Sequence, residues 1–181
     1  GTEITLHIKR IEKEYLDKER IGFITRKYSD HLMYSVNFID GKNEPELLNK
    51  ASAIWTREKK DISAEQYEEF YKQIGAGFNK PLLTLHNKVE GTLSYINLLF
   101  IPDSRPFDLF QMDVKSKIKL YSNRVLITDD SESILPRWLR FVKGIVDTSD
   151  VDLNVSREML QHNVTLNKIS KALKKRVINE L

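Results

Sequence analysis

The sequence contains no cysteine among its 181 residues. Disulfide cross-links, thiol nucleophiles and cysteine zinc sites are therefore excluded, and the composition fits a reducing compartment. No run of about 18 apolar residues is present, so the sequence predicts no membrane-spanning helix. The net charge of +3 is too small to indicate binding to nucleic acid or to a membrane.

The sequence also lacks the motifs of a nucleotide or metal site. No Gly-x-x-x-x-Gly-Lys phosphate loop is present, and the stretch 75–77 (Gly-Ala-Gly) is too short for a dinucleotide fingerprint. The sequence has four histidines, and their spacing is not that of metal ligands: His7, His31, His86 and His162. The sequence therefore predicts that this chain holds no metal and binds nucleotide poorly by itself.

Alternating strand patterns and helical patterns follow one another along the chain. Strands are predicted near residues 4–8, 34–38, 93–101, 118–128 and 145–146. Helices are predicted near residues 15–28, 64–74, 136–142 and 166–177. Interleaved elements of this kind predict an α/β fold in which helices cover a sheet.

Two of the predicted helices have clear sequence signals. Ser63 and Gln66 have the spacing of a capping box at the start of the second helix. The last helix carries its apolar residues on one face, and these are Leu166, Ile169, Leu173 and Val177. Its other faces carry Lys168, Lys171, Lys174 and Lys175. Both helices are therefore predicted to pack an apolar face against the core.

Arg157 stands in the first turn of a predicted helix, where the helix dipole disfavours a cation. Ser156 is a good N-cap for that helix. Backbone N–H groups beside a guanidinium form an anion site, and phosphate is the obvious ligand. The alternative is a surface arginine that Glu158 or another carboxylate neutralises.

A second candidate site is the apolar segment at 106–112, which contains Phe107, Leu109, Phe110 and Met112. If these side chains are exposed, they form a patch that can bind a partner protein. If they are buried, they form a satellite core. Trp55 has the same two interpretations.

Several blocks of the sequence together resemble the ninety-kilodalton heat-shock chaperones. Residues 150–161 resemble the family's catalytic loop, and residues 134–147 are similar to the helix and strand before it. Further similar blocks are 1–6, 54–57, 67–72 and 100–110. The short stretch at 40–50 resembles the bacterial high-temperature protein G type.

The resemblance implies that residues 1–181 are a single domain, the first and larger part of the family's middle domain. The implied fold is a mixed β-sheet sandwiched by helices, ending in a long amphipathic helix. ATP and Mg are expected on an N-terminal domain outside this chain, and homodimerisation through a C-terminal domain outside it. The implied protein is a cytoplasmic, ATP-dependent stress-response chaperone that binds client proteins. Neither nucleic acid nor membrane is an expected partner.

The resemblance also implies roles for single residues. Arg157 matches the arginine that contacts the γ-phosphate of ATP in the N-terminal domain. Gln161 and Asn154 belong to the same catalytic loop, and Leu126 falls where an apolar side chain helps to position that loop. The residues matching client-contacting positions are Trp55, Phe107, Leu109 and Phe110.

One stretch departs from the family. Val151-Asp152 stands where the family usually has leucine-proline, so a constraint on φ before the loop is lost. An alternative function stays open, a non-enzymatic interaction domain that uses the apolar loop and the basic last helix. The sequence upstream of this chain would distinguish the two functions, because only the chaperone function requires an ATP-binding domain there.

Overall fold

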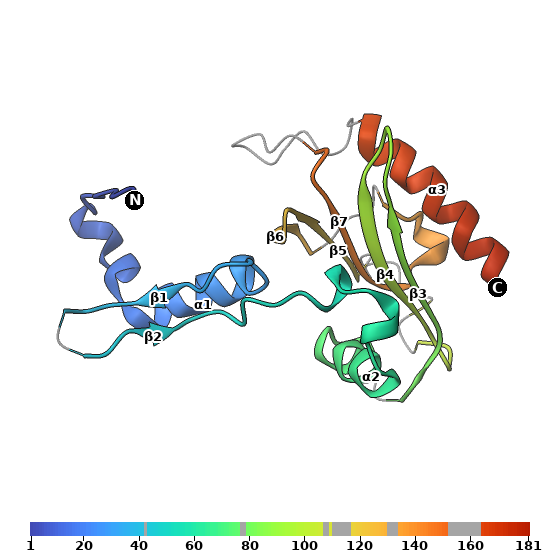
Figure 1. The fold of residues 1–181 in the computed structure, drawn as a ribbon, viewed down its shortest axis with the longest axis horizontal. Coiled ribbons are helices and arrows are strands. Elements are labelled where there is room, and N and C mark those ends of the chain that lie inside the picture. Colours follow the sequence, from blue (N-terminus) through green and yellow to red (C-terminus); the bar gives the residue numbers. More distant parts are fainter. Residues whose placement is uncertain (42, 77–78, 107–108, 110–116, 130–133, 152–163) are drawn as a thin grey trace. The chain divides into compact units, whose positions relative to one another are not determined.

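The chain divides into two compact units in the computed structural model, Gly1–Ser52 and Ala53–Leu181 (Figure 1). The structure describes all residues except 42, 77–78, 107–108, 110–116, 130–133 and 152–163. The sequence predicts one domain over residues 1–181, whereas the backbone contacts fall into these two groups. Each unit is therefore described by itself.

The first unit contains a short helix pair and a small hairpin. Its elements are η1 (Arg10–Leu16), α1 (Lys18–Ser29), β1 (Asn37–Phe38) and β2 (Glu46–Leu47). α1 covers most of the helix predicted near 15–28, and it begins where the Asp17 carboxylate accepts a hydrogen bond from the Arg20 backbone N–H at 3.0 Å. The predicted strand near 34–38 is reduced to two residues, antiparallel to β2.

The strand predicted near residues 4–8 is wrong. No strand forms there, and Ile4 and Leu6 are 78% and 76% exposed. An alternating sequence becomes a strand only when a neighbouring backbone pairs with it, and within the described residues none does.

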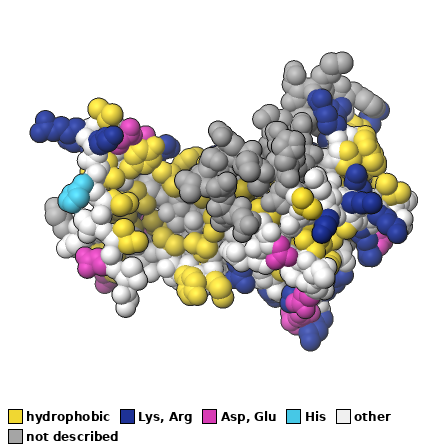
Figure 2. All heavy atoms as spheres, turned by 90° about the horizontal axis from the view of Figure 1, so that it is seen from above, with side chains coloured by type: hydrophobic (Ala, Val, Ile, Leu, Met, Phe, Trp, Pro, Cys, Tyr) yellow, Lys and Arg dark blue, Asp and Glu magenta, His cyan; other side chains and the backbone are white. Residues whose placement is uncertain are grey.

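The first unit has little buried surface, and a buried amide connects its parts. Figure 2 shows hydrophobic side chains over the visible face of this unit. Asn49 is 4% exposed, and its side-chain oxygen accepts a hydrogen bond from the Val36 N–H at 2.9 Å. Its amide nitrogen donates to the carbonyls of Ser29 and Tyr34 at 3.2 and 3.0 Å. One polar side chain therefore joins the end of α1 to the hairpin, in a unit with few buried apolar residues.

The second unit is built on a five-stranded mixed sheet with the strand order β3-β4-β7-β5-β6. Its strands are β3 (Pro81–Val89), β4 (Tyr95–Pro102), β5 (Lys117–Ser122), β6 (Val125–Thr128) and β7 (Lys143–Thr148). β5 and β7 are parallel, and the other neighbouring pairs are antiparallel.

Helices lie on both faces of this sheet (Figure 1). They are η2 (Ile54–Thr56), η3 (Lys59–Asp61), α2 (Ala64–Gln73), η4 (Arg137–Leu139) and α3 (Val164–Glu180). The capping box at Ser63 and Gln66 is present as predicted. The helix predicted at 136–142 is only a 3-10 turn, and its Trp138 is 59% exposed although Leu135 and Leu139 are buried.

One face of the sheet packs against α3. The four predicted apolar residues of this helix are all buried, and they join strand residues of one alternating set in a single core, including Leu99, Ile118 and Val146. The opposite face is aromatic. Phe100 packs at a tilt against Phe70 and Tyr71 of α2, with ring centroids 6.3 and 5.2 Å apart. The predicted class, a mixed sheet between helices ending in a long amphipathic helix, is therefore confirmed.

Two strands differ from the prediction. β3 was not predicted, because its alternation of Leu with Thr, His and Asn is weak. The single strand predicted over 118–128 is a hairpin, because Asn123 and Arg124 take φ values of 49° and 67° and form a two-residue turn between β5 and β6.

Gly144 lies on β7 and pairs with Leu99 of β4. Its φ is +143°, and an added Cβ would lie 2.2 Å from the carbonyl oxygen of Leu98. Gly91 has a similar φ of +153° but no heavy atom within 4 Å of its added Cβ. The two glycines therefore have similar positive φ values, but only Gly144 lacks the space for a Cβ atom.

We predict that Gly144→Ala lowers the free energy of unfolding by about 2 kcal/mol more than Gly91→Ala does. Both variants carry the penalty of a side chain at positive φ, and only the first adds a collision with backbone. Urea unfolding of the two variants measures the difference. Equal losses would show that β7 can shift away from β4 at little cost.

Candidate functional site

The predicted catalytic residues Asn154, Arg157 and Gln161 lie outside the described residues. The structure does describe the chain immediately before and after them. β7 leads into this segment, and α3 starts at Val164 directly after it. The two flanks therefore define where the segment is attached.

The chain entering the segment is held by a group of polar contacts. The Ser94 backbone N–H donates to the Asp150 carboxylate at 2.7 Å, and the Thr148 hydroxyl donates to the Ser94 carbonyl at 2.8 Å. The Asp150 N–H also donates to the Thr148 hydroxyl oxygen at 3.2 Å. These bonds tie the end of β7 to the start of β4.

Both flanks are also anchored in the core. Val151 is 3% exposed and Leu166 is fully buried, and both belong to the apolar cluster between the sheet and α3. Val151 occupies the first position of the departure from the family pattern, and it still supplies a buried apolar side chain there. Asp152, the second position, lies outside the described residues.

Trp55 is buried, so the expectation that it offers an exposed surface to clients is wrong for this structure. It is 1% exposed, and its indole Nε1–H donates to the Asp147 carboxylate at 2.8 Å. Its ring packs against those of Phe70 and Tyr121, with centroid distances of 5.8 and 5.0 Å. The buried carboxylate on β7, which sequence reasoning did not identify, explains why the tryptophan turns inward.

Asp147 joins three parts of the second unit. It is 7% exposed, and besides the Trp55 indole it accepts a hydrogen bond from the Arg124 backbone N–H at 3.3 Å. Leu126 is 4% exposed and pairs with Tyr121 across the β5–β6 hairpin. Leu126 therefore lies next to the ring that packs on Trp55, and its implied role in positioning the loop stays a prediction.

The other predicted client-contacting residues are only partly described. Phe107 and Phe110 lie outside the described residues, and Leu109 is half-buried, in a turn closed by its N–H bond to the Pro106 carbonyl at 3.1 Å. The exposed and buried interpretations of this segment both stay open.

His86 is part of the aromatic core face. Its Nε2 lies 2.8 Å from the Trp55 carbonyl oxygen, and its Nδ1 lies 2.7 Å from the Tyr67 hydroxyl. A carbonyl can only accept, so Nε2 carries the hydrogen and Nδ1 accepts from Tyr67. Burial lowers the pKa of His86 below its ordinary value, although the bond to the Trp55 carbonyl acts in the opposite direction.

The part of the chain that the structure describes has neither a cluster of metal ligands nor a helix able to span a membrane. No three or more histidine or acidic side chains are grouped there as metal ligands would be. None of the described helices combines the length and apolar character that crossing a bilayer requires.

The chain is similar to known chaperones over its whole length. The family model described as Hsp90 protein matches residues 39–181. Chaperone protein HtpG of Rhodospirillum rubrum is 51% identical over 181 residues, and that of Paramagnetospirillum magneticum is 50% identical over the same length. HtpG of Rickettsia rickettsii (strain Sheila Smith) is 50% identical over 183 residues. Each match covers 100% of this chain and 29% of the relative, so the chain spans under a third of these relatives' length.

We predict that Trp55→Phe lowers the free energy of unfolding by about 2–4 kcal/mol. The change removes the indole donor and leaves the buried Asp147 carboxylate with the Arg124 N–H. Trp138→Phe, at an exposed tryptophan, is the matched control and should change stability by less than about 0.5 kcal/mol. Denaturant unfolding measures both, and similar losses would mean that the Trp55–Asp147 bond adds little.

We further predict that acidification below about pH 6.5 destabilises the chain in part through His86. Between the lowered folded-state pKa and the unfolded-state pKa, the unfolded state binds the extra proton, so stability falls as the pH falls through this window. His86→Gln should reduce the loss of stability between about pH 7.5 and pH 5.5, whereas His7→Gln, at an exposed site, should not. Urea unfolding at the two pH values gives the comparison, and an unchanged loss in His86→Gln would contradict the prediction.

Proposed function

The chain belongs to the Hsp90 protein family, and from this membership we propose that it is the middle segment of an ATP-dependent chaperone. In this role it completes the ATPase site of a separate nucleotide-binding domain and contributes part of the client-binding surface. The observation that carries the proposal is identity of about half the residues to HtpG chaperones along the entire chain.

The fold supports the assignment to a middle segment. The second unit is a mixed sheet between helices, which is the architecture that the resemblance implies for that part of the family. Neither a phosphate loop nor a dinucleotide fingerprint occurs in the sequence, so ATP and Mg are proposed to bind on another domain. The proposed homodimer would likewise form through a C-terminal domain outside this chain.

Arg157 is the proposed γ-phosphate contact, and Asn154 and Gln161 are its proposed partners in the loop. The sequence predicts Arg157 in the first turn of a helix with Ser156 as N-cap, and such an arrangement suits an anion that arrives from outside the chain. The anchored flanks at Val151 and Leu166 give the loop a fixed base. A fixed base limits the conformations that the loop must lose when the phosphate is contacted.

Client binding is proposed to use the segment around Phe107, Leu109 and Phe110. Its apolar side chains suit contact with the hydrophobic stretches that unfolded proteins expose. Trp55 is proposed to act indirectly, because its ring is buried and could support only the shape of the surface above it.

A second candidate function is a non-enzymatic interaction domain. The observation that favours it is the exposed basic side of α3, which carries Lys168, Lys171 and Lys175. Figure 2 shows Lys and Arg side chains gathered on the part of the surface that contains α3. An upstream sequence without an ATP-binding domain would favour this function over the first.

We predict that Arg157→Ala, made in the complete chaperone, lowers ATP turnover by about 10³-fold, as expected for an arginine that stabilises the transferred phosphoryl group. Nucleotide affinity should change much less, because the contact forms only when the domains close. Arg157→Lys should recover part of the turnover, since an ammonium lacks the planar two-pronged geometry.

The matched control is Arg176→Ala, on the exposed side of α3, where the arginine pairs with Glu180 at 2.8 Å. It should leave turnover within about twofold of the unmodified protein. Steady-state ATPase assays and a nucleotide titration on each variant provide the measurements. Equal turnover in the Arg157 and Arg176 variants would remove the basis of the proposed catalytic role.

A further inference from the structure

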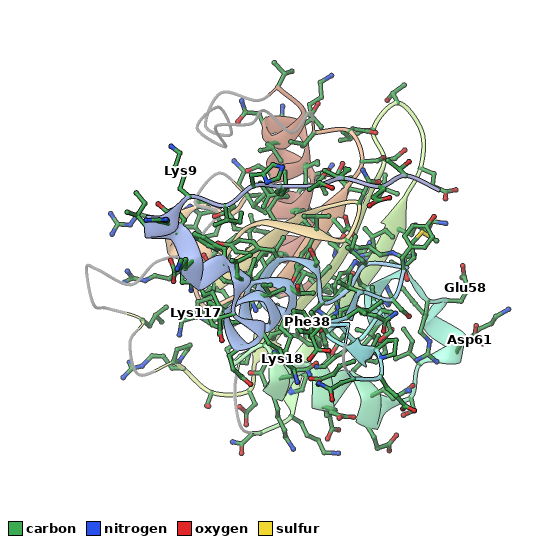
Figure 3. The ribbon with its side chains drawn as sticks, turned by 90° about the vertical axis from the view of Figure 1, so that its left-hand side faces the viewer. Lys9, Lys18, Phe38, Glu58, Asp61 and Lys117 are labelled. Atoms are coloured by element: carbon green, nitrogen blue, oxygen red, sulfur yellow. The ribbon has the colours of Figure 1, made fainter. Side chains whose placement is uncertain are left out.

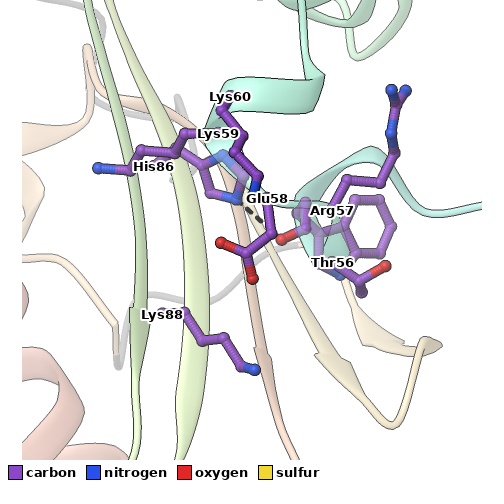
Figure 4. A pocket seen from close by; sticks show the side chains of 8 residues that line it. Thr56, Arg57, Glu58, Lys59, Lys60, His86 and Lys88 are labelled. Atoms are coloured by element: carbon purple, nitrogen blue, oxygen red, sulfur yellow. Dashed lines mark hydrogen bonds between the residues drawn. The ribbon is translucent and has the colours of Figure 1, made fainter.

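A pocket of about 320 Å³ opens on the aromatic side of the second unit, between the η2–η3 segment and β3 (Figure 4). This volume is at the small end of the range for ligand sites in proteins. β3 is an edge strand of the sheet, so the pocket lies beside a border that a passing chain can reach. Figure 3 labels Glu58 and Asp61 on this segment, and both residues are exposed.

The pocket lining is strongly cationic. It contains four basic side chains and one carboxylate, and these are Arg57, Lys59, Lys60, Lys88 and Glu58. Lys59 and Lys60 are exposed, and neither forms an ion pair with a described residue. Lys88 pairs with Glu90 at 2.7 Å, but both side chains are more than half exposed, so the pair is weak and easily exchanged.

The floor of the pocket is preformed. Trp55 and His86 are 1% and 5% exposed, and the His86 ring is fixed at both nitrogens. The neutral imidazole leaves the positive charge of the site to the lysines and the arginine. A ligand therefore does not have to order the floor, and binding costs little conformational entropy there.

We propose that this pocket, lined by Lys59, Lys60 and Lys88 above the Trp55–His86 floor, binds an acidic segment of a partner polypeptide. The segment places one or two carboxylates among the lysines while its backbone passes along the β3 edge. This inference rests on the proposed chaperone function, because it assigns one chemical class of polypeptide to a site on the chain.

The lining favours carboxylates on a peptide over a phosphate group. Two-pronged recognition of phosphate uses an arginine fork, and one terminal nitrogen of the Arg57 guanidinium already donates to the Asp61 carbonyl. Figure 4 shows the Arg57 side chain extending away from the space above His86. The remaining cations are lysines, which act as flexible point charges and suit acidic side chains at variable positions.

Glu58 is the residue that opposes binding. In Figure 4 its carboxylate points into the space over His86 and Lys88. An arriving acidic side chain must displace this carboxylate or share the lysines with it, and like charges at short range repel. Glu58 therefore sets the affinity, and its removal should strengthen binding.

The experiment is fluorescence anisotropy on the 181-residue chain with a short labelled peptide of alternating glutamate and glycine. The same peptide with glutamine in place of glutamate is the uncharged comparison. We expect Lys59→Gln with Lys60→Gln to raise the Kd about fivefold or more, and Glu58→Gln to lower it about twofold or more. Binding should weaken as salt rises, since the charges are exposed.

The matched control removes two lysines from α3, Lys168→Gln with Lys171→Gln, so the net charge falls equally. This control should shift the Kd by less than about twofold. Equal weakening by the two pairs would overturn the proposal, because only the total charge would matter. Equal binding of the glutamine peptide would also overturn it, as would displacement by inorganic phosphate at concentrations close to the peptide Kd. Thermal melting checks that each variant is folded.

The experiments test the acidic-segment site and the proposed catalytic role of Arg157 independently. If Arg157→Ala abolishes ATP turnover in the complete chaperone but removal of Lys59 and Lys60 leaves the Kd of the acidic peptide unchanged, only the pocket assignment is wrong. If the pocket binds the peptide as expected while turnover is independent of Arg157, the acidic-segment site stands and the catalytic proposal is wrong.

Discussion

The hydrogen bond between the Trp55 indole and the Asp147 carboxylate is the constraint on which the second unit depends. A buried carboxylate is costly unless hydrogen-bond donors face it, and here a side chain and a backbone N–H supply them. The bond joins the η2 turn to β7, and the Arg124 contact adds the β5–β6 turn. The Asp147 carboxylate therefore holds the η2 turn and the β5–β6 turn against the aromatic side of the sheet. The floor of the cationic pocket follows from it, because the Trp55 carbonyl orients His86.

The opposite face depends on close packing instead. Gly144 lets β7 approach β4 more closely than any side chain would permit, and the apolar stripe of α3 covers the resulting surface. The same core contains Val151 and Leu166, which flank the segment proposed to contact ATP. The packing that stabilises the sheet thus also fixes the base of the proposed catalytic loop. The proposed ATP hydrolysis would therefore depend on Val151 and Leu166, although neither residue is proposed to contact the nucleotide.

Much of this architecture is readable from local patterns. The apolar spacing of α3, the capping box at Ser63 and the buried run in β4 each depend on neighbours in sequence, and the structure contains all three. β3 and the β5–β6 turn were missed because their signals are weak until a partner strand is present. The alternation at residues 4–8 failed for the converse reason, since it has no strand to pair with in the described chain.

The sequence by itself determined the class of fold, the lack of cysteine chemistry and the family likeness, because these depend on composition and on the order of local blocks. The tertiary structure alone decided that Trp55 is buried, since only folding brings Asp147 within 2.8 Å of its indole across 92 positions of chain. It also decided that lysines on η3 and β3 share one pocket with a buried histidine. Both outcomes are long-range contacts, and no pattern within a short window encodes them.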